Sequence, residues 1–281
     1  MIQDLEKVVE AGWGAMRDIP GYITEREARF LMRAIALAPV SGTNVEIGSF
    51  KGRSTAGLAY IARHYGLGSV VAIDPHTCPS AGDPSLGEDV STIGHFTENL
   101  SRAGLSDVVD ARQAYAADVA KGWHRPIRFL WIDGDHSYPA VQSDLRLFKP
   151  FLVDGAIVVM HDVLSTWEGP LRVFDEEVLR GRGFGPAGFY GTIAWTQYRP
   201  RDGRSLRYRI ARRAMSIPVR RLIAIAIRAK RRFGEEKLIL LRGVPQLHYK
   251  FWRALLPHGA RAIPRFEREV RRRMPPWGGT A

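Results

Sequence analysis

Acidic and histidine residues follow two apolar segments of this sequence, at the points where those segments end. The first segment, residues 127–132, ends at Asp133, and His136 lies three positions further on. The second ends at His161-Asp162. If both segments are neighbouring strands, two carboxylates meet at one edge of a sheet. Carboxylates in a setting without cysteine suit Mg²⁺ or a similar cation, and a histidine beside them can accept a proton from a hydroxyl.

A glycine-containing turn, residues 45–55, is the second feature with chemical potential. Glu46 precedes Gly48, and Gly52 opens a helix-forming segment. A phosphate-binding loop needs Gly-x4-Gly-Lys-Ser/Thr, which the turn lacks. A dinucleotide fingerprint needs Gly-x-Gly-x-x-Gly, but Phe50 stands where the second glycine would let a pyrophosphate approach. Both phosphate-binding interpretations are therefore disfavoured.

S-adenosylmethionine suits this turn better, because it has no phosphate. Its amino acid end needs an acid and backbone amides, which Glu46 and the turn would supply. Its ribose diol needs an acid after the next strand, where Asp74 follows residues 69–73. A plain turn that uses glycine for its positive φ would also explain Gly48 and Gly52. Asp74 lies about 20–30 residues further on, as in nucleotide-binding folds, and therefore favours a cofactor.

Strand and helix patterns alternate around these residues. We expect strands at 45–47, 69–73, 108–111, 127–132, 156–160 and 192–198, and helices at 53–65, 92–103, 114–122, 137–151 and 171–180, with a loop at 75–89. This alternation predicts an α/β fold, a Rossmann-like doubly wound and mostly parallel sheet with helices on both faces. Ligands of such folds bind beyond the carboxyl ends of the strands. Four strand ends here have acids or histidines, which favours a site over coincidence.

The glycine turn and the acidic segments resemble the sequence motifs of two groups of enzymes. Acid-x-Gly-x3-Gly-x-Ser from Glu46 to Ser54, followed by an acid at Asp74, resembles the motif pair of class I S-adenosylmethionine-dependent methyltransferases. Residues 133–138, Asp-Gly-Asp-His-Ser-Tyr, resemble the bacterial metal-dependent O-methyltransferases that modify sugar hydroxyls, such as the macrocin and mycinamicin enzymes, with the cephalosporin hydroxylase type as a relative. The resemblance covers about residues 40–198.

That resemblance implies roles for individual residues. Asp133 and Asp162 would be metal ligands, and His136, which replaces the lysine of the catechol and caffeoyl-CoA enzymes, would be the general base. His161 would be a nitrogen ligand of the metal or a residue that shapes the site. The residues expected to contact S-adenosylmethionine are Glu46, Gly48, Ser49, Lys51, Gly52, Ser54, Asp74, Gln113 and Asp133. The expected reaction is metal-dependent methyl transfer to a hydroxyl of a sugar or glycan.

Two other functions stay open. Another reaction of the hydroxylase type could use the same fold and metal site. A nucleic-acid-associated methyltransferase could use a basic tail, although the Asn-Pro-Pro-Tyr type motif of amino methyltransferases is missing from residues 133–138. Few aromatic residues are interleaved with the basic ones, so nucleic acid is not the expected partner.

The C-terminal part of the chain differs in charge from the rest. Residues 1–198 hold 18 Lys+Arg and 24 Asp+Glu, a charge of 18 − 24 = −6, so residues 199–281 hold the other 23 and 5, a charge of +18. We expect N-terminal helices over residues 1–40, with a capping box at Thr24 and Glu27, to form a lid or an oligomer contact. The methyltransferase domain then spans 41–198, and a basic, mainly helical extension spans 199–281.

The basic extension has several possible partners. Residues 207–233 read as a basic helix broken near Pro218, and its apolar residues 222–227 suit a helix that lies on an anionic bilayer. A solvated basic face and a dimerisation arm or lid are the alternatives. The single cysteine, Cys78, and the lack of an export signal or a run of 18 apolar residues predict a cytoplasmic protein, peripheral at the inner membrane face if the helix binds lipid.

Overall fold

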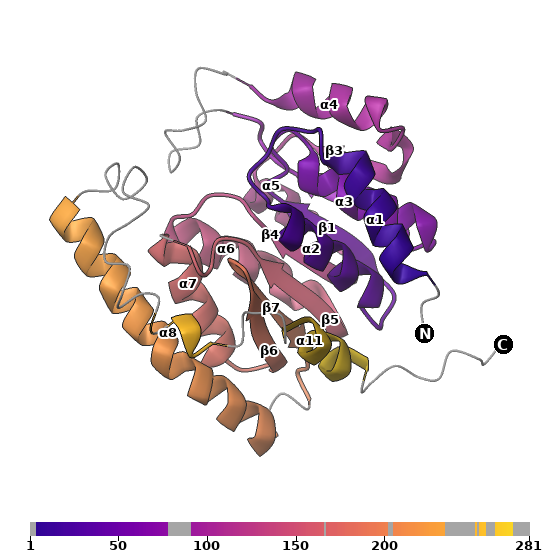
Figure 1. The fold of residues 1–281 in the computed structure, drawn as a ribbon. Coiled ribbons are helices and arrows are strands. Elements are labelled where there is room, and N and C mark those ends of the chain that lie inside the picture. Colours follow the sequence, from indigo (N-terminus) through magenta and orange to yellow (C-terminus); the bar gives the residue numbers. More distant parts are fainter. Residues whose placement is uncertain are drawn as a thin grey trace.

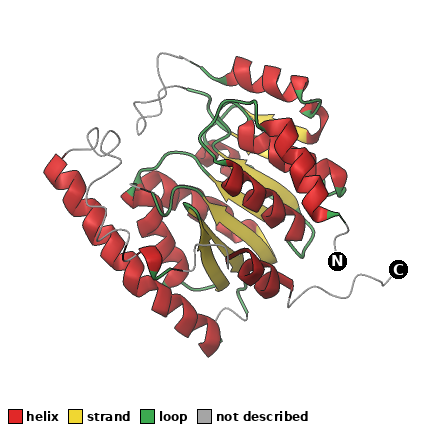
Figure 2. Cartoon of the chain, viewed as in Figure 1, coloured by secondary structure: helices red, strands yellow, loops and turns green. Residues whose placement is uncertain are grey.

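The computed structural model describes residues 4–77, 91–165, 167–201, 205–233, 251, 253–256 and 262–271. The predicted loop at 75–89 lies mostly outside these residues, as do Cys78 and large parts of the basic extension. The chain forms one layered α/β structure, with a central sheet between two sets of helices (Figures 1 and 2).

Seven strands form the sheet in the order β3-β2-β1-β4-β5-β7-β6. They are β1 (Thr43–Ile47), β2 (Val70–Ile73), β3 (Val109–Arg112), β4 (Ile127–Ile132), β5 (Leu152–Met160), β6 (Phe184–Tyr190) and β7 (Ile193–Tyr198). The first five strands are parallel, and β7 is antiparallel to both β5 and β6. The predicted mostly parallel sheet is therefore confirmed, with the order reversing between β1 and β4, where ligands bind in such folds.

Helices cover both faces of this sheet. They are α1 (Leu5–Met16), α2 (Glu25–Leu37), α3 (Arg53–His64), α4 (Ile93–Arg102), α5 (Ala116–Lys121), α6 (Tyr138–Phe148), α7 (Glu168–Val173), α8 (Leu206–Phe233) and α11 (Ala262–Arg271). Trp131 and Val159 point into a core shared with α1, α2 and α3, whereas Leu130 and Val158 point into a core shared with α6, α7 and α8. Burial on both faces explains why β4 and β5 read as nearly continuous apolar runs.

Helix α2 is fixed at both ends. At its start, Thr24 and Glu27 form the predicted capping box. At its end, the buried Arg128 side chain of β4 donates hydrogen bonds to the carbonyl oxygens of Ile35, Ala38 and Val40. The last carbonyls of a helix have no partners within it, and Arg128 supplies hydrogen bonds at this end. The N-terminal helices thus pack directly on the sheet that positions the polar strand ends.

Three elements differ from the sequence predictions. Strand β6 was not predicted, because its Gly-Pro-Ala-Gly stretch is untypical of a strand; β6 is an edge strand, where proline is tolerated. The helix expected at 171–180 is instead α7 followed by a π-helix, η4 (Phe174–Leu179). Helix α8 continues through Pro218, whose buried side chain lies among the inward-facing residues of this helix. Packing outweighs the hydrogen bond that proline cannot donate.

Candidate functional site

The glycine turn after β1 contacts the end of β4 directly. Gly48 has a φ of 84° and donates its amide to the carbonyl of Ile73, 2.9 Å away. A Cβ atom at Gly48 would lie 2.2 Å from the carbonyl oxygen of Asp133, so only glycine allows this approach. Gly52, with a φ of 90°, precedes α3. The turn and the acidic end of β4 are therefore one continuous structure.

Asp74, at the end of β2, holds the turn in shape. One carboxylate oxygen accepts hydrogen bonds from the amides of Ser49 and Phe50, both at 2.8 Å, and the other accepts from the amide of His76 at 2.7 Å. Phe50 and His76 have left-handed φ values of 47° and 55°. Such backbone outliers cluster at ligand sites. The buried hydroxyl of Ser49 has no hydrogen-bond partner among the described residues, so it is available to a ligand.

Glu46 is fully buried behind the turn rather than facing an open space. Its two oxygens accept hydrogen bonds from the hydroxyls of Ser54 and Thr55, each at 2.6 Å, which joins β1 to the start of α3. Burial raises the pKa of Glu46 to about 8; the two hydroxyls oppose this shift, and the charges of Asp133 and Asp74 add to it. The carboxyl group is therefore mostly protonated at neutral pH.

Two further residues predicted to contact the cofactor are Lys51, within the glycine turn, and Gln113. The carbonyl oxygen of Lys51 accepts a hydrogen bond from Asn99, and its ammonium lies 5.2 Å from the centre of the Phe50 ring. Gln113 is exposed directly after β3. Their predicted contacts with the cofactor stay predictions.

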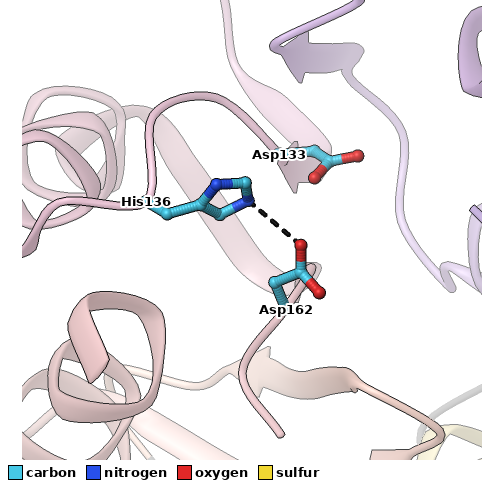
Figure 3. A group of neighbouring side chains, drawn as sticks. All are labelled: Asp133, His136 and Asp162. Carbon is cyan, nitrogen blue, oxygen red and sulfur yellow. Dashed lines mark ion pairs between the residues drawn. The ribbon is translucent and has the colours of Figure 1, made fainter. Parts of the chain in front are cut away.

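Asp133, His136 and Asp162 come together at the carboxyl ends of β4 and β5 (Figure 3). One potential ligand atom from each of the three lies within 4.8 Å of the others. Nε2 of His136 lies 3.1 Å from Oδ2 of Asp162, an ion-pair distance, although the ring is not aligned for a good hydrogen bond. Asp162 has a left-handed φ of 52°. The arrangement leaves a buried imidazole nitrogen and two carboxylates facing one small space.

The His136 ring is held from one side by the segment before α7. It stacks on Trp167, with ring centroids 5.0 Å apart and planes at 10°. A Cβ atom at Gly169 would lie 2.2 Å from the carbonyl oxygen of His136, so the start of α7 packs closely against this backbone. Burial lowers the pKa of His136, but Asp162 and Asp133 outweigh it, and the pKa is raised overall.

His161 lies behind the group of three rather than within it. Its Nδ1 is 2.9 Å from Oδ1 of Asp133 and 3.6 Å from Oδ2 of Asp162, and its Nε2 is 3.8 Å from Oε2 of Glu27. Burial lowers the pKa of His161, but the three carboxylates outweigh it and raise the pKa well above 6.5. Both ring nitrogens already face carboxylates, Nδ1 those of Asp133 and Asp162 and Nε2 that of Glu27. This geometry favours His161 as an orienting partner of Asp133.

Sequence reasoning missed two residues of this site. Glu27 was recognised only as part of a helix cap, yet its carboxylate also accepts hydrogen bonds from the amide and hydroxyl of Thr192, both at 2.7 Å. Burial raises the pKa of Glu27, but His161, Thr24 and Thr192 outweigh it and lower the pKa. Trp167 was assigned no role. The sequence signals for the two residues were an acid within a helix cap and an aromatic residue near a strand end.

The residues at this edge fit a divalent cation. Two carboxylates and one imidazole nitrogen from different strand ends converge, and the Nε2 atom of His136 is buried without an aligned partner among the described residues. Glu27, Asp133 and Asp162 outnumber the two histidines, so the edge has a net negative charge even when both imidazoles are protonated. Carboxylate oxygens suit Mg²⁺ or Mn²⁺, so Asp133 and Asp162 would hold such a cation beside His136.

Comparison with known proteins identifies similar folds. Residues 45–163 match a family model described as a methyltransferase domain. The O-methyltransferase NovP superposes with a TM-score of 0.56 at 15% identity, covering 69% of this chain and 98% of that one. An O-methyltransferase from Bacillus cereus in complex with SAH has a TM-score of 0.48 at 20% identity, covering 69% and 90%, and the calicheamicin methyltransferase CalS11 has 0.49 at 15%, covering 68% and 91%.

The chain therefore has the fold of known O-methyltransferases such as NovP, and residues 45–163 match a methyltransferase domain. The predicted class I methyltransferase fold is confirmed. The metal, the acceptor and the roles of single residues stay predictions. Within the described residues, no helix has the length and apolar character needed to cross a bilayer.

Proposed function

We propose that this protein transfers a methyl group from S-adenosylmethionine to a hydroxyl of a sugar or glycan, in a divalent-metal-dependent reaction. The observation behind this proposal is the convergence of Asp133, His136 and Asp162 at two adjacent strand ends, in direct contact with the glycine turn through Gly48. A methyl donor seated on that turn would present its methyl group to the acidic edge.

The turn has the groups that such a donor needs. The unpaired Ser49 hydroxyl and the turn backbone would hold its amino acid end. Asp74 would maintain the shape of the turn through its hydrogen bonds to the amides of Ser49 and Phe50. Glu46, protonated and buried, would support this wall rather than pair with the ammonium group. The acidic edge would favour the positive sulfonium. Alignment of donor and acceptor, with water excluded, is the main contribution that the fold can make to this reaction.

The bonding changes are simple. The acceptor oxygen forms a bond to the methyl carbon as the carbon–sulfur bond breaks, and S-adenosylhomocysteine leaves as a neutral thioether. The hydroxyl proton passes to Nε2 of His136, which Trp167 and Asp162 hold in place. A divalent cation held by Asp133 and Asp162 would supply Lewis acidity that lowers the pKa of the hydroxyl.

The choice of a sugar acceptor rests on the sequence of residues 133–138 and its resemblance to sugar-modifying enzymes. Trp167 supports it in a modest way, since an aromatic face beside the proposed base offers an apolar platform next to polar groups, the combination that a sugar ring presents.

A methyl-transfer assay with labelled S-adenosylmethionine tests the proposal. Sugar nucleotides and glycosides would serve as acceptors, in excess EDTA and after addition of Mg²⁺ or Mn²⁺. We expect labelled methyl ether only with metal present, and binding of S-adenosylhomocysteine, followed by thermal shift, in both conditions. Methylation that persists in excess EDTA would remove the metal from the proposal. Transfer to catechols but not to sugars would keep the reaction and replace the acceptor class.

A further inference from the structure

The outward side of helix α8 combines arginine with exposed aliphatic residues. Leu206, Ile210 and Ile217 are 66%, 59% and 64% exposed. At 3.6 residues per turn, these positions lie within about 40° of one another around the helix. The exposed arginines within about 60° of the mean direction of these three side chains are Arg213, Arg220, Arg221, Arg228 and Arg231. We call these eight residues the arginine face.

The arginine face differs from the inward side of the same helix. Met215, Val219 and Leu222 are buried in the core under β6, α7 and η4. Leu222 was expected to contact lipid, and that expectation is wrong because this side chain packs inside the protein. The helix runs along one flank of the molecule, with its outer side away from the sheet (Figure 1). Helix α8 is therefore anchored by its buried apolar side, and the arginine face on the other side is free of that packing role.

The charge of this face is of one sign only. Helix α8 contains no Asp or Glu over its 28 residues. Arg207, beside the face, is 3.0 Å from Glu269, but Arg213, Arg220, Arg228 and Arg231 form no salt bridge with another described residue. Residues 206–231 extend over about 38 Å, so the positive charge forms a long stripe rather than a point.

We propose that the arginine face binds the surface of an anionic lipid bilayer. The arginines would contact lipid phosphates, and Leu206, Ile210 and Ile217 would enter the boundary between headgroups and acyl chains, as in helices that lie in the interface plane. This inference is independent of the proposed methyl transfer, because it uses no residue of the site at the strand ends.

Two other occupants fit the face less well. A nucleic acid groove would place aromatic residues among the arginines for base stacking, but Tyr208 is engaged by Arg199 and the apolar members of the face are aliphatic. A second copy paired through this face in a symmetric dimer would bring arginines against arginines. Phosphate-bearing lipid satisfies both the charge and the aliphatic side chains.

Vesicle co-sedimentation of the full-length protein tests this inference. We expect it to pellet with phosphatidylcholine vesicles that contain phosphatidylglycerol, and not with phosphatidylcholine alone, with binding weakened by salt. The variant R213Q/R220Q/R228Q should bind anionic vesicles on the order of a hundredfold more weakly, since each basic residue contributes about fivefold. The variant I210S/I217S should lose about tenfold or more and show greater sensitivity to salt, because part of its apolar contact is lost.

A matched control separates the face from net charge. K7Q/R102Q/K121Q removes the same number of charges from exposed sites on other elements. It should keep binding within about twofold, and unchanged thermal unfolding should show that all variants fold, since the substituted residues are exposed. Equal losses in this control and in the R213Q/R220Q/R228Q variant would overturn the inference, as would equal binding to neutral vesicles. Binding to duplex DNA or RNA, or dimerisation sensitive to I210S/I217S, without vesicle binding would also overturn it.

Discussion

The glycine turn and the acidic edge satisfy their polar groups in different ways. In the turn, Glu46 binds hydroxyls only eight and nine residues away, and Asp74 binds amides 24 and 25 residues back. At the acidic edge, His161 binds Asp133 across 28 residues, and Glu27 binds Thr192 across 165. The hydrogen bonds of these two turn acids span at most 25 residues, whereas the edge also depends on a contact across 165 residues.

The two regions also differ in what they leave unsatisfied. Both Glu46 and Asp74 have hydrogen bonds to each carboxylate oxygen, so these acids are stable without a ligand. At the edge, carboxylates crowd around two imidazoles, and a buried nitrogen of His136 lacks an aligned partner among the described residues. Residual charge and unmet hydrogen-bonding capacity mark a functional site more strongly than a glycine pattern does. We therefore place the reaction at the edge and the support of the cofactor at the turn.

Among the substitutions that test this difference between the two regions, that of Asp133 should have the largest effect on the rate of methyl transfer. Asp133→Asn removes one of the two carboxylates and the nearest charge partner of His161. We expect the single-turnover rate of methyl transfer to fall by about 10⁴-fold, which corresponds to several kcal/mol of lost stabilisation. Asp135→Asn is the control, because Asp135 accepts a hydrogen bond from the Ser137 amide, which asparagine can also accept. A loss of similar size in both variants would show that the conformation of residues 133–137, and not the carboxylate of Asp133, determines the rate.

Removal of the proposed base should come next. His136→Ala should lower the rate by about 10³-fold, within the range for loss of a general base. Because Asp162 and Asp133 outweigh burial and raise the pKa of His136, the wild-type rate should increase with pH through that raised pKa. The variant should lose this rise, as measured by a pH–rate profile. A variant that keeps the profile, or that loses Mn²⁺ binding instead of rate, would move His136 out of the base role.

Glu27 tests whether the long-range contacts of the edge matter for metal binding. Glu27→Gln removes the charge that faces Nε2 of His161, which in turn orients Asp133. Loss of such an outer partner typically costs 10–100-fold in metal affinity, so we expect Mn²⁺ to bind about tenfold more weakly in a fluorescence titration. Glu25→Gln, an exposed acid on the same helix turn, should leave the affinity unchanged. Equal Mn²⁺ affinities in both variants would restrict Glu27 to a structural role.

The same residue should also influence stability at low pH. The lowered pKa of Glu27 means that its charged form stabilises the native state above the ordinary pKa near 4.5, and that this contribution disappears as the pH falls. Wild-type protein should therefore lose stability more steeply than Glu27→Gln on acidification below about pH 5. Urea denaturation at several pH values measures this difference, and parallel curves would contradict it.

Much of the fold could be predicted from the sequence, because strands buried on both faces appear as apolar runs and polar residues mark their ends. Residues 127–132 and Asp133 are an example, as is the capping box at Thr24. Strand β6 could not be predicted, since pairing with β7 alone, at the sheet edge, tolerates glycine and proline. The π-helix η4 has no sequence signature that spacing alone reveals.

The candidate site was predictable only in part, and for the same physical reason. Asp133, His136 and Asp162 follow apolar strands, so parallel pairing brings them together. The contact of Glu27 with His161 depends on how α2 crosses the sheet, which Arg128 fixes through carbonyls at the far end of the helix. No short-range pattern encodes that crossing. The stacking of Trp167 on His136 likewise depends on the close packing of Gly169.

Glu46 provides the test with the smallest expected effect in this comparison of the glycine turn with the acidic edge, because sequence and structure suggest different roles for it. The sequence pattern predicts a charged acid near the ammonium group of the cofactor, whereas the structure has a buried carboxyl group with a pKa of about 8. Glutamine can replace a protonated carboxyl, since its oxygen accepts from one hydroxyl of Ser54 or Thr55 and its nitrogen donates to the other. We expect Glu46→Gln to change the Kd for S-adenosylhomocysteine at pH 7 by less than about threefold, measured by calorimetry.

The pH dependence of stability gives this variant an independent measurement. Since burial raises the pKa of Glu46 from 4.5 to about 8, wild-type stability should decline as the pH rises across that interval, because the unfolded chain releases its proton first. Glu46→Gln cannot ionise, so its stability relative to wild type should increase from pH 5 to pH 8, by roughly 1–3 kcal/mol in urea denaturation. A weakening of cofactor binding by more than about tenfold, with no such relative gain in stability, would mean that Glu46 is charged in the native protein. The charged Glu46 carboxylate would then need the cofactor as a partner, just as the polar groups of the acidic edge need a ligand.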